Sequence, residues 1–195
     1  MAEKRINEVT KEVELSDISV SVRVFWIFAF ALLAAIGAQI EIPNQPVPFT
    51  LQTLFVLLAG PLLGKKSGAA SMGLYVILGT AGLPVFSGAG FGIARIFGPT
   101  GGYLLSFPVA AFTIGYLAGI RREYWWTVIS MIIGSLLILC IGTIQLNFVY
   151  IHNWQQAFQT GFFIFSLWDA VKIIGAATIV HYYFRTMSFN KNQSN

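Results

Sequence analysis

The stretch that decides the fold is FFIFSLWDAVKIIGAATIVHYYF, residues 162–184, which is almost entirely apolar but has an aspartate and a lysine near its middle. Its length suffices to cross a bilayer, because about 20 apolar residues in a helix span the hydrocarbon core. Asp169 and Lys172 stand three residues apart, so a helix places them on one face, where their charges offset each other. Each charge inside the membrane costs about 2.5–3.5 kcal/mol, so the pair indicates a functional site. The alternative is a buried pair that only fixes helix packing.

The composition of the whole chain supports a membrane location. Hydrophobic residues make up 56% of the 195 residues and charged residues only 10%, with a mean hydropathy of +0.71. Soluble domains carry about 25% charged residues. We therefore expect an all-α integral membrane protein in the cell (inner or cytoplasmic) membrane, without a separate soluble domain. The single cysteine, Cys140, excludes a disulfide bond within the chain and a cysteine metal cluster.

Breaks in the apolar pattern predict six transmembrane helices. Prolines between residues 41 and 48 end the first of them, since proline cannot continue a helix. The expected spans are residues 24–40, 50–63, 67–83, 103–120, 126–147 and 161–184. The predicted domain organisation is an N-terminal tail at 1–23, a six-helix membrane domain at 24–184 and a second tail at 185–195.

The basic residues predict the orientation of these spans. Loops rich in lysine and arginine stay in the cytoplasm. Ten of the twelve basic residues fall on one side of the six-span arrangement: Lys4, Arg5, Lys11, Arg23, Lys65, Lys66, Arg121, Arg122, Arg185 and Lys191. Both termini and both tails are therefore expected in the cytoplasm, with Arg95 and Lys172 in the outer half. The distribution of the basic residues sets this topology, and the net charge of +4 gives no reason to expect a nucleic acid partner.

A glycine-rich segment, residues 84–102, joins the third and fourth expected spans. It is too apolar for a free loop and too rich in glycine for a helix. Irregular backbone at membrane depth is tolerated only where it is buried in protein or lines a cavity. We interpret the segment as a lid that carries Arg95 over a pocket open to the outside. The alternative is a tightly turned connector with no role in ligand binding.

Small residues recur at four-residue spacing on two spans. The spacing allows close approach between helices, within one chain or between chains. On the first span we favour a contact with a partner helix, and a homo-oligomer is possible. On the fourth span, a contact within the chain is favoured. The residues are Ala31 with Ala35, Ala34 with Ala38, and Gly115 with Gly119.

No catalytic signature is found in the sequence. The stretch 60–67 is similar to a phosphate-binding loop but fails in spacing and in context, so the chain itself cannot hydrolyse ATP. His152 and His181 fall at opposite ends of the expected bundle, which excludes a metal pair or a serine protease arrangement. We expect no enzyme, no metal and no cofactor.

Four motifs in order carry a resemblance to a known family. They are PVPFTLQTL at 46–54, AGLPVFSG at 81–88, GPTGGY at 98–103 and DAVK at 169–172. On these motifs, residues 24–184 resemble the BioY family, the biotin-specific S components of energy-coupling factor (ECF) transporters. The resemblance implies a six-helix bundle that binds biotin from outside and joins a transmembrane T component and two cytoplasmic ATPases. It also implies that Ala31 and Ala35 face the T component.

The chemistry of biotin suits the polar residues that these motifs contain. Biotin has a ureido ring with two N–H donors and a carbonyl, an apolar ring and tail, and one carboxylate. Asp169 is suited to accept the ureido N–H groups, and Lys172 to donate to the ureido carbonyl or to meet the carboxylate. Gln52 and Tyr103 are expected to add neutral hydrogen bonds.

Arg95 is the other candidate for the biotin carboxylate. Some relatives place a basic residue directly after the Gly-Gly-Tyr motif, where this chain has Leu104. Phe86, Phe91 and Trp168 are candidates to pack on the biotin rings, the alternative being that each belongs to the core or to the membrane belt.

Two other functions stay open at the level of sequence. One is an S component for a different vitamin, which would bind thiamine or riboflavin in place of biotin. The other is a freestanding proton-coupled carrier, in which Asp169 would relay protons. An intramembrane enzyme is remote, because the sequence offers no nucleophile, base or metal set.

Overall fold

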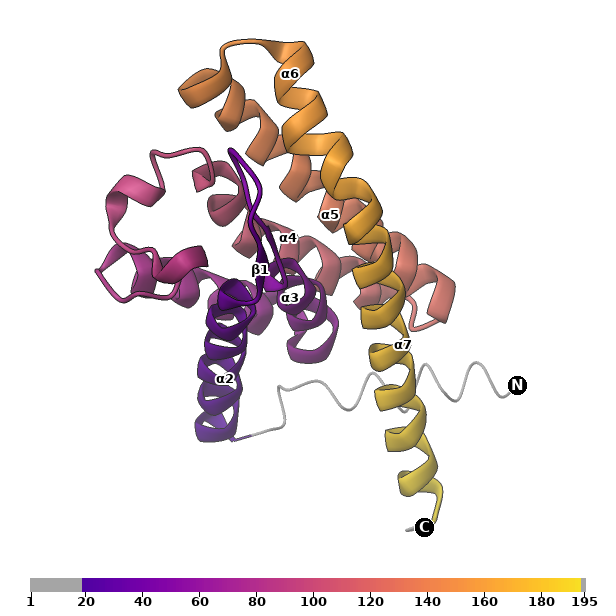
Figure 1. Cartoon of the computed structure of the whole chain (residues 1–195). Helices are drawn as coiled ribbons and strands as arrows, with labels where there is room; N and C mark the ends of the chain where they lie inside the picture. Colours follow the sequence, from indigo (N-terminus) through magenta and orange to yellow (C-terminus); the bar gives the residue numbers. More distant parts are fainter. Residues whose placement is uncertain (1–18, 194–195) are drawn as a thin grey trace.

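The protein, in a computed structural model that describes residues 19–193, is built almost entirely from helices (Figure 1). The helices are α2 (Val20–Gln39), α3 (Gln52–Thr80), α4 (Gly101–Ile120), α5 (Tyr124–Leu146), α6 (Trp154–Phe158) and α7 (Ile164–Gln193). Two short strands, β1 (Glu41–Ile42) and β2 (Phe49–Thr50), pair antiparallel. Short 3₁₀ turns η1 (Ser87–Ala89) and η2 (Ile93–Arg95) lie in the lid, and π-helical turns η3 (Asn147–Ile151) and η4 (Gln159–Phe163) flank α6.

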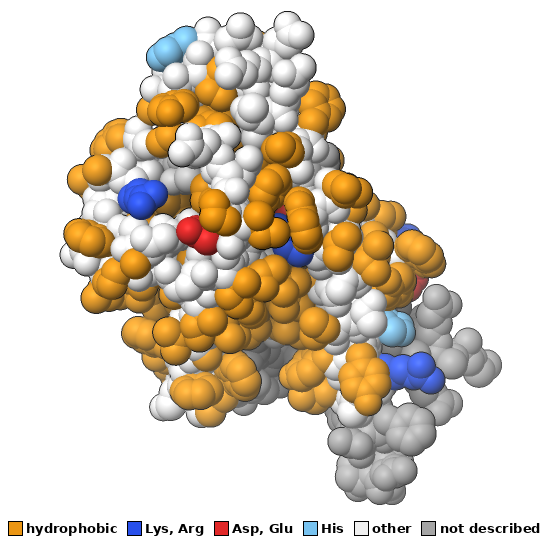
Figure 2. Space-filling view, in the orientation of Figure 1, with side chains coloured by type: hydrophobic (Ala, Val, Ile, Leu, Met, Phe, Trp, Pro, Cys, Tyr) orange, Lys and Arg blue, Asp and Glu red, His pale blue; other side chains and the backbone are white. Residues whose placement is uncertain are grey.

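Helix length and apolar composition agree with a multi-pass membrane protein. Four helical stretches are long and apolar enough to cross a bilayer: residues 20–39, 101–120, 124–151 and 154–187. Hydrophobic side chains cover much of the face in Figure 2, and charged side chains interrupt them only in places. The predicted tails stay a prediction, and residues 1–18 and 194–195 of them lie outside the described chain. Helix α2 begins at Val20, within the predicted first tail, and α7 continues to Gln193 through the predicted second one.

The second and third expected spans are the two arms of α3. Its helical geometry breaks at Gly64, whose φ of 80° and ψ of 162° favour glycine. A Cβ added at Gly68 would lie 2.7 Å from the carbonyl oxygen of Ala59. A straight helix would hold these two residues about 13 Å apart along its axis, so α3 bends back on itself. The interval at residues 64–66 between the second and third expected spans agrees with this break. Each arm is shorter than the roughly 20 residues of a full span, and the number of six spans stays a prediction.

The core lies where α3 meets α4, with α2 on one side and α5 and α7 on the other. The closest approach of α3 and α4 is made by two glycines: a Cβ at Gly115 would lie 2.7 Å from the carbonyl oxygen of Gly60 and from the Lys65 amide nitrogen. The contact of Gly115 within the chain is therefore confirmed. A Cβ at Gly119 would meet open space, so that position makes no such contact.

The alanines of α2 also serve packing within the chain. Ala31, Ala34, Ala35 and Ala38 are each at most 8% exposed, because α2 packs against α3 along this face. Ala31 and Ala35 also border an open apolar groove that Phe28 and Leu32 continue along α2. A partner helix in this groove stays a prediction.

The two ends of the molecule differ. Helix α2 begins and α7 ends at the same end, whereas α6 lies at the opposite end (Figure 1). The lid and the strand pair lie away from the end where α2 starts, and they roof the cavity described next.

Candidate functional site

A cavity lies under the lid, between the strand pair and helices α3, α4, α5 and α7. Its cavity volume is about 60 Å³. Six of the eight predicted ligand residues line it: Gln52, Phe86, Arg95, Tyr103, Asp169 and Lys172. The rest of the wall consists of Val47, Pro48, Thr50, Thr53, Ser87, Thr100, Leu104, Phe107, Ile138, Leu139 and Phe165.

The floor of the cavity is the ion pair predicted on α7. The Lys172 Nζ atom lies 2.6 Å from Asp169 Oδ1, and the two side chains are only 11% and 6% exposed. Ser135 on α5 donates to Asp169 Oδ2 at 2.5 Å. A hydrogen bond to a charged group contributes about 1.5–3 kcal/mol, which helps to offset the desolvation of the carboxylate.

Thr53 on α3 joins both members of the pair. Its hydroxyl accepts a hydrogen bond from Lys172 Nζ and donates to Asp169 Oδ1 at 3.5 Å. Lys172 also donates to the Thr50 carbonyl oxygen at 3.5 Å, so its three donors all meet protein atoms. The two longest of these hydrogen bonds are the weakest, and a ligand could replace them at the lowest cost.

The lid is held by side chains from two helices. Gln39, at the end of α2, donates to the Phe86 carbonyl oxygen at 3.0 Å and accepts from the Ala89 amide at 3.0 Å. Gln145 on α5 donates to the Ile96 carbonyl oxygen at 2.6 Å. Ser87 bonds the carboxylate of Glu41 in β1. The lid therefore has a defined shape over the cavity.

Arg95 reaches the cavity from the lid, folded across Gly90. A Cβ at position 90 would lie 2.6 Å from Arg95 Nε and 2.7 Å from Cζ, so only glycine leaves the guanidinium this place. Within residues 19–193, no ion pair or protein hydrogen bond of the Arg95 side chain is found. Its five donors can therefore meet an anionic ligand.

Gln52 and Tyr103 differ in the hydrogen bonds that they can still form in the cavity. Gln52 is 5% exposed, and its side-chain amide has no hydrogen bond within the described residues. The Tyr103 hydroxyl donates to the Gly161 carbonyl oxygen at 2.8 Å. Gln52 can thus donate and accept, whereas Tyr103 can only accept a further hydrogen bond while it keeps this contact.

The three predicted aromatic residues have different places. Phe86 is 2% exposed and packs edge-on against Tyr75 at 5.5 Å, so it is both core and cavity wall. Phe91 and Trp168 are not among the lining residues and are 59% and 47% exposed. Gly92, with a φ of 85°, lets the chain turn next to Phe91, and Trp168 lies on α7 beside the ion pair with its ring 6.2 Å from Phe49. The structure does not bring these two into the cavity, and Phe165 supplies an aromatic wall that the sequence reasoning missed.

Three further polar contacts were also missed: Thr53, Ser135 and the Thr50 carbonyl oxygen. Thr53 and Thr50 lie inside the PVPFTLQTL motif, which was the only signal for them. Ser135 is a lone hydroxyl in an apolar helix and carried no signal. Among residues 19–193, no group of three His, Cys, Asp or Glu side chains could hold a metal ion.

Known proteins are similar to this chain over most of its length. The family model described as the BioY family matches residues 9–189. The biotin transporter BioY of Thermotoga maritima is 43% identical over 150 residues, which cover 77% of this chain and 88% of that protein. The probable biotin transporter BioY of Pyrococcus horikoshii is 43% identical over 151 residues, with the same coverage of 77% and 88%.

A solved structure has the same fold. The crystal structure of the S-component for biotin from an ECF-type ABC transporter superposes with a TM-score of 0.79 at 25% identity, over 87% of this chain and 94% of that one. The resemblance inferred from the four motifs is confirmed. With a match along nearly its whole length, the chain belongs to the BioY family.

Proposed function

We propose that this chain binds biotin from the outer face of the cell membrane and mediates its uptake as the S component of an ECF transporter. The observation that carries the proposal is the buried Asp169–Lys172 pair at the floor of a cavity whose lid holds an arginine. The BioY relatives and the structural neighbour support biotin as the transported ligand. The chain is a transporter subunit rather than an enzyme, and it requires no cofactor besides its ligand.

The ureido ring of biotin fits the floor of the cavity. An ionised carboxylate has about four acceptor sites, and Asp169 uses three of them for Ser135, Lys172 and Thr53. One ureido N–H can take the remaining site, and the other can replace the long bond from Thr53. Lys172 would then give up the Thr50 carbonyl oxygen, also 3.5 Å away, and donate to the ureido carbonyl. Gln52 can supply a further neutral hydrogen bond.

The biotin carboxylate is assigned to Arg95 rather than to Lys172. The donors of Lys172 already meet Asp169, Thr53 and Thr50, whereas the guanidinium of Arg95 makes no ion pair within residues 19–193. A guanidinium binds a carboxylate with two parallel hydrogen bonds, which favours arginine at this place. Phe86 and Phe165 would pack on the apolar part of biotin between these two polar ends.

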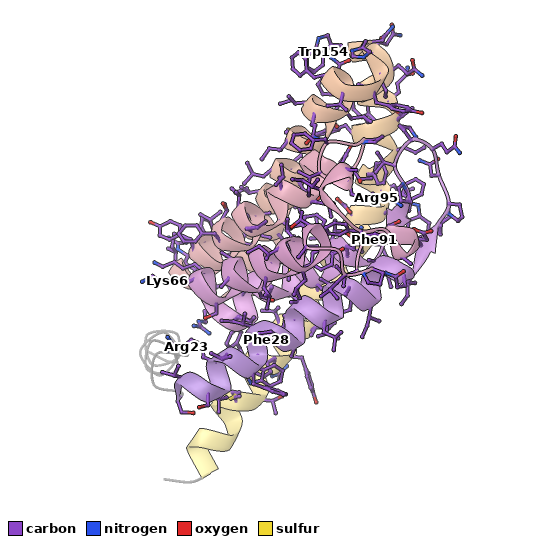
Figure 3. The ribbon with its side chains drawn as sticks, turned by 90° about the vertical axis from the view of Figure 1, so that its left-hand side faces the viewer. Arg23, Phe28, Lys66, Phe91, Arg95 and Trp154 are labelled. Carbon is purple, nitrogen blue, oxygen red and sulfur yellow. The ribbon has the colours of Figure 1, made fainter. Side chains whose placement is uncertain are left out.

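The proposal also covers the orientation of the chain in the membrane and its protein partners. Arg23 and Lys66 lie together at the end opposite Arg95 (Figure 3), which supports six spans with both termini in the cytoplasm. A T component and two ATP-binding subunits would provide the energy, and the groove beside Ala31 and Ala35 would receive the T component. Phe91 and Trp168 would contact biotin only after a movement of the lid or of α7.

Biotin titration of the purified chain tests the proposal. We expect Asp169→Asn to lower biotin affinity at least 100-fold, because the amide cannot accept two N–H groups beside a lysine. Glu123→Gln makes the same chemical change at an exposed position outside the cavity and should bind like the unaltered chain. Unchanged affinity in Asp169→Asn would refute the site. Binding of thiamine or riboflavin in place of biotin would point to another vitamin, and pH-dependent uptake without ATP hydrolysis to a proton-coupled carrier.

A further inference from the structure

A second cavity lies at the opposite end of the molecule from the lid, and basic side chains surround it. Four of its lining residues are cationic: Arg23 from α2, Lys65 and Lys66 from α3, and Arg122 from the turn before α5. Arg23 and Lys66 lie near one another at this end in Figure 3. None of its lining residues in the described chain is acidic. We call this cavity the basic pocket.

Glycines and a helix break give the basic pocket its space. Its free volume is about 580 Å³. A Cβ at Gly64 or at Gly119 would meet no atom within 4 Å, and both glycines line the pocket. The positive φ of Gly64 breaks α3 just before the two lysines, so the chain brings both to the rim. The backbone break at Gly64 and the missing side chains of two glycines thus contribute to the pocket.

Aromatic rings hold two of the cations in place. The Lys65 Nζ atom lies 5.1 Å from the centre of the Tyr116 ring, and the Arg122 guanidinium lies 4.2 Å from the centre of the Phe184 ring. Such contacts contribute to orienting a cation and keep its long side chain from moving freely. Lys65 and Lys66 make no ion pair within residues 19–193. The oriented ammonium group of Lys65 and the neighbouring one of Lys66 therefore have no carboxylate partner within the described chain and are available to an anion.

The remaining wall points to a ligand that is both anionic and apolar. Leu62, Val180, Phe184 and Ile120 line the basic pocket beside the cations, and Ile120 is 55% exposed at its edge. A small water-soluble anion would leave this apolar wall unused, whereas a phospholipid places its phosphate beside its acyl chains. Basic pockets between membrane helices on the cytoplasmic side suit anionic lipid head groups.

We propose that the basic pocket binds the phosphate group of an anionic membrane lipid. Lys65 and Lys66 meet the phosphate oxygens, and Leu62 and Val180 contact the start of the acyl chains. Each basic side chain near an anionic membrane surface contributes about 1 kcal/mol. Removing both lysine charges should therefore lower the affinity for an anionic lipid about 30-fold.

Lipid retention by the full-length chain tests this proposal. The protein is placed in nanodiscs of phosphatidylcholine mixed with phosphatidylglycerol or cardiolipin, extracted into neutral detergent, and its bound lipids are identified by native mass spectrometry. We expect enrichment of the anionic lipid over phosphatidylcholine, and loss of this enrichment in the double variant Lys65→Gln, Lys66→Gln. Gly119→Leu should lower it as well, because the leucine side chain enters the pocket and leaves all four cations.

The control is Arg121→Gln, which removes a charge from the same end of the molecule but from a residue outside the basic pocket. It should retain the lipid. Equal loss in Arg121→Gln and in the lysine double variant would overturn the proposal, since net charge alone would then explain the binding. Undiminished retention in Gly119→Leu would overturn it too. Inorganic phosphate that displaces the lipid at an equal concentration would identify free phosphate as the ligand and reject the lipid source.

Discussion

The cavity under the lid and the basic pocket differ in how their charged side chains are arranged. Under the lid, the charges of Asp169 and Lys172 cancel within 2.6 Å, and hydroxyl groups of Thr53 and Ser135 add hydrogen bonds to the pair. In the basic pocket, four cations converge and no lining residue of the described chain is acidic. The first arrangement can lie deep in a low-dielectric region, and the second must stay near water or an external anion.

This difference indicates what each place can recognise. A neutralised pair offers directed donors and acceptors, which suit a neutral polar ring such as the ureido group of biotin. The ammonium groups of Lys65 and Lys66 offer charge with little direction, which suits the phosphate of a lipid.

The largest expected effect separates the stability of the pair from its role in binding. Lys172→Met leaves the buried carboxylate of Asp169 without a countercharge, which should cost about 3–5 kcal/mol of folding stability. The double variant Lys172→Met, Asp169→Asn should recover most of that loss and still fail to bind biotin. Thermal unfolding in detergent and biotin titration measure the two effects on the same samples. A double variant that binds biotin normally would mean that the pair only fixes helix packing.

The next largest effect tests whether the lid positions Arg95 for biotin. Gly90→Ala should displace the Arg95 guanidinium, since a Cβ there would lie 2.6 Å from Nε, while the backbone at φ −67° and ψ 150° accepts alanine. We expect it to lower biotin affinity as Arg95→Gln does, by about 10- to 150-fold for a lost charge-assisted hydrogen bond.

Gly73→Ala is the matched control for this lid variant, because its Cβ would meet open space on α3. It should leave the dissociation constant for biotin unchanged. If Gly90→Ala also binds normally while Arg95→Gln does not, the guanidinium reaches the ligand from another position and the packing argument is wrong.

Several features of the fold were predictable because they depend on local patterns. The ion pair follows from the i, i+3 spacing of Asp169 and Lys172 in an apolar run, and the break of α3 from the glycine and two lysines at 64–66. The irregular backbone of the lid follows from the glycine content of residues 84–102. Each of these can be recognised within one short stretch of sequence.

The residues that support the pair could not be predicted in this way. Thr53 and Ser135 are 116 and 34 positions from Asp169 in the sequence, and only tertiary packing brings them together. Hydroxyl groups in membrane helices commonly bond a carbonyl of their own helix, as Ser130 bonds the Trp126 carbonyl oxygen. Nothing in the sequence distinguishes Ser135 from Ser130. The places of Phe91 and Trp168 outside the cavity could not be predicted either, because an aromatic side chain beside a motif can point into the cavity or away from it.

The smallest expected effect uses these two serines, which are both buried on α5. Ser135→Ala removes the 2.5 Å hydrogen bond to Asp169 Oδ2, while Lys172 and Thr53 still hold the other oxygen. The carboxylate should then turn more freely, and biotin affinity should fall about tenfold, at the lower end for a hydrogen bond to a charged group. Ser130→Ala removes a hydroxyl that bonds only its own helix and should bind biotin normally. Equal binding by the two variants would mean that Ser135 does not orient Asp169. The cavity under the lid would then differ less from the basic pocket in how precisely its polar groups are directed.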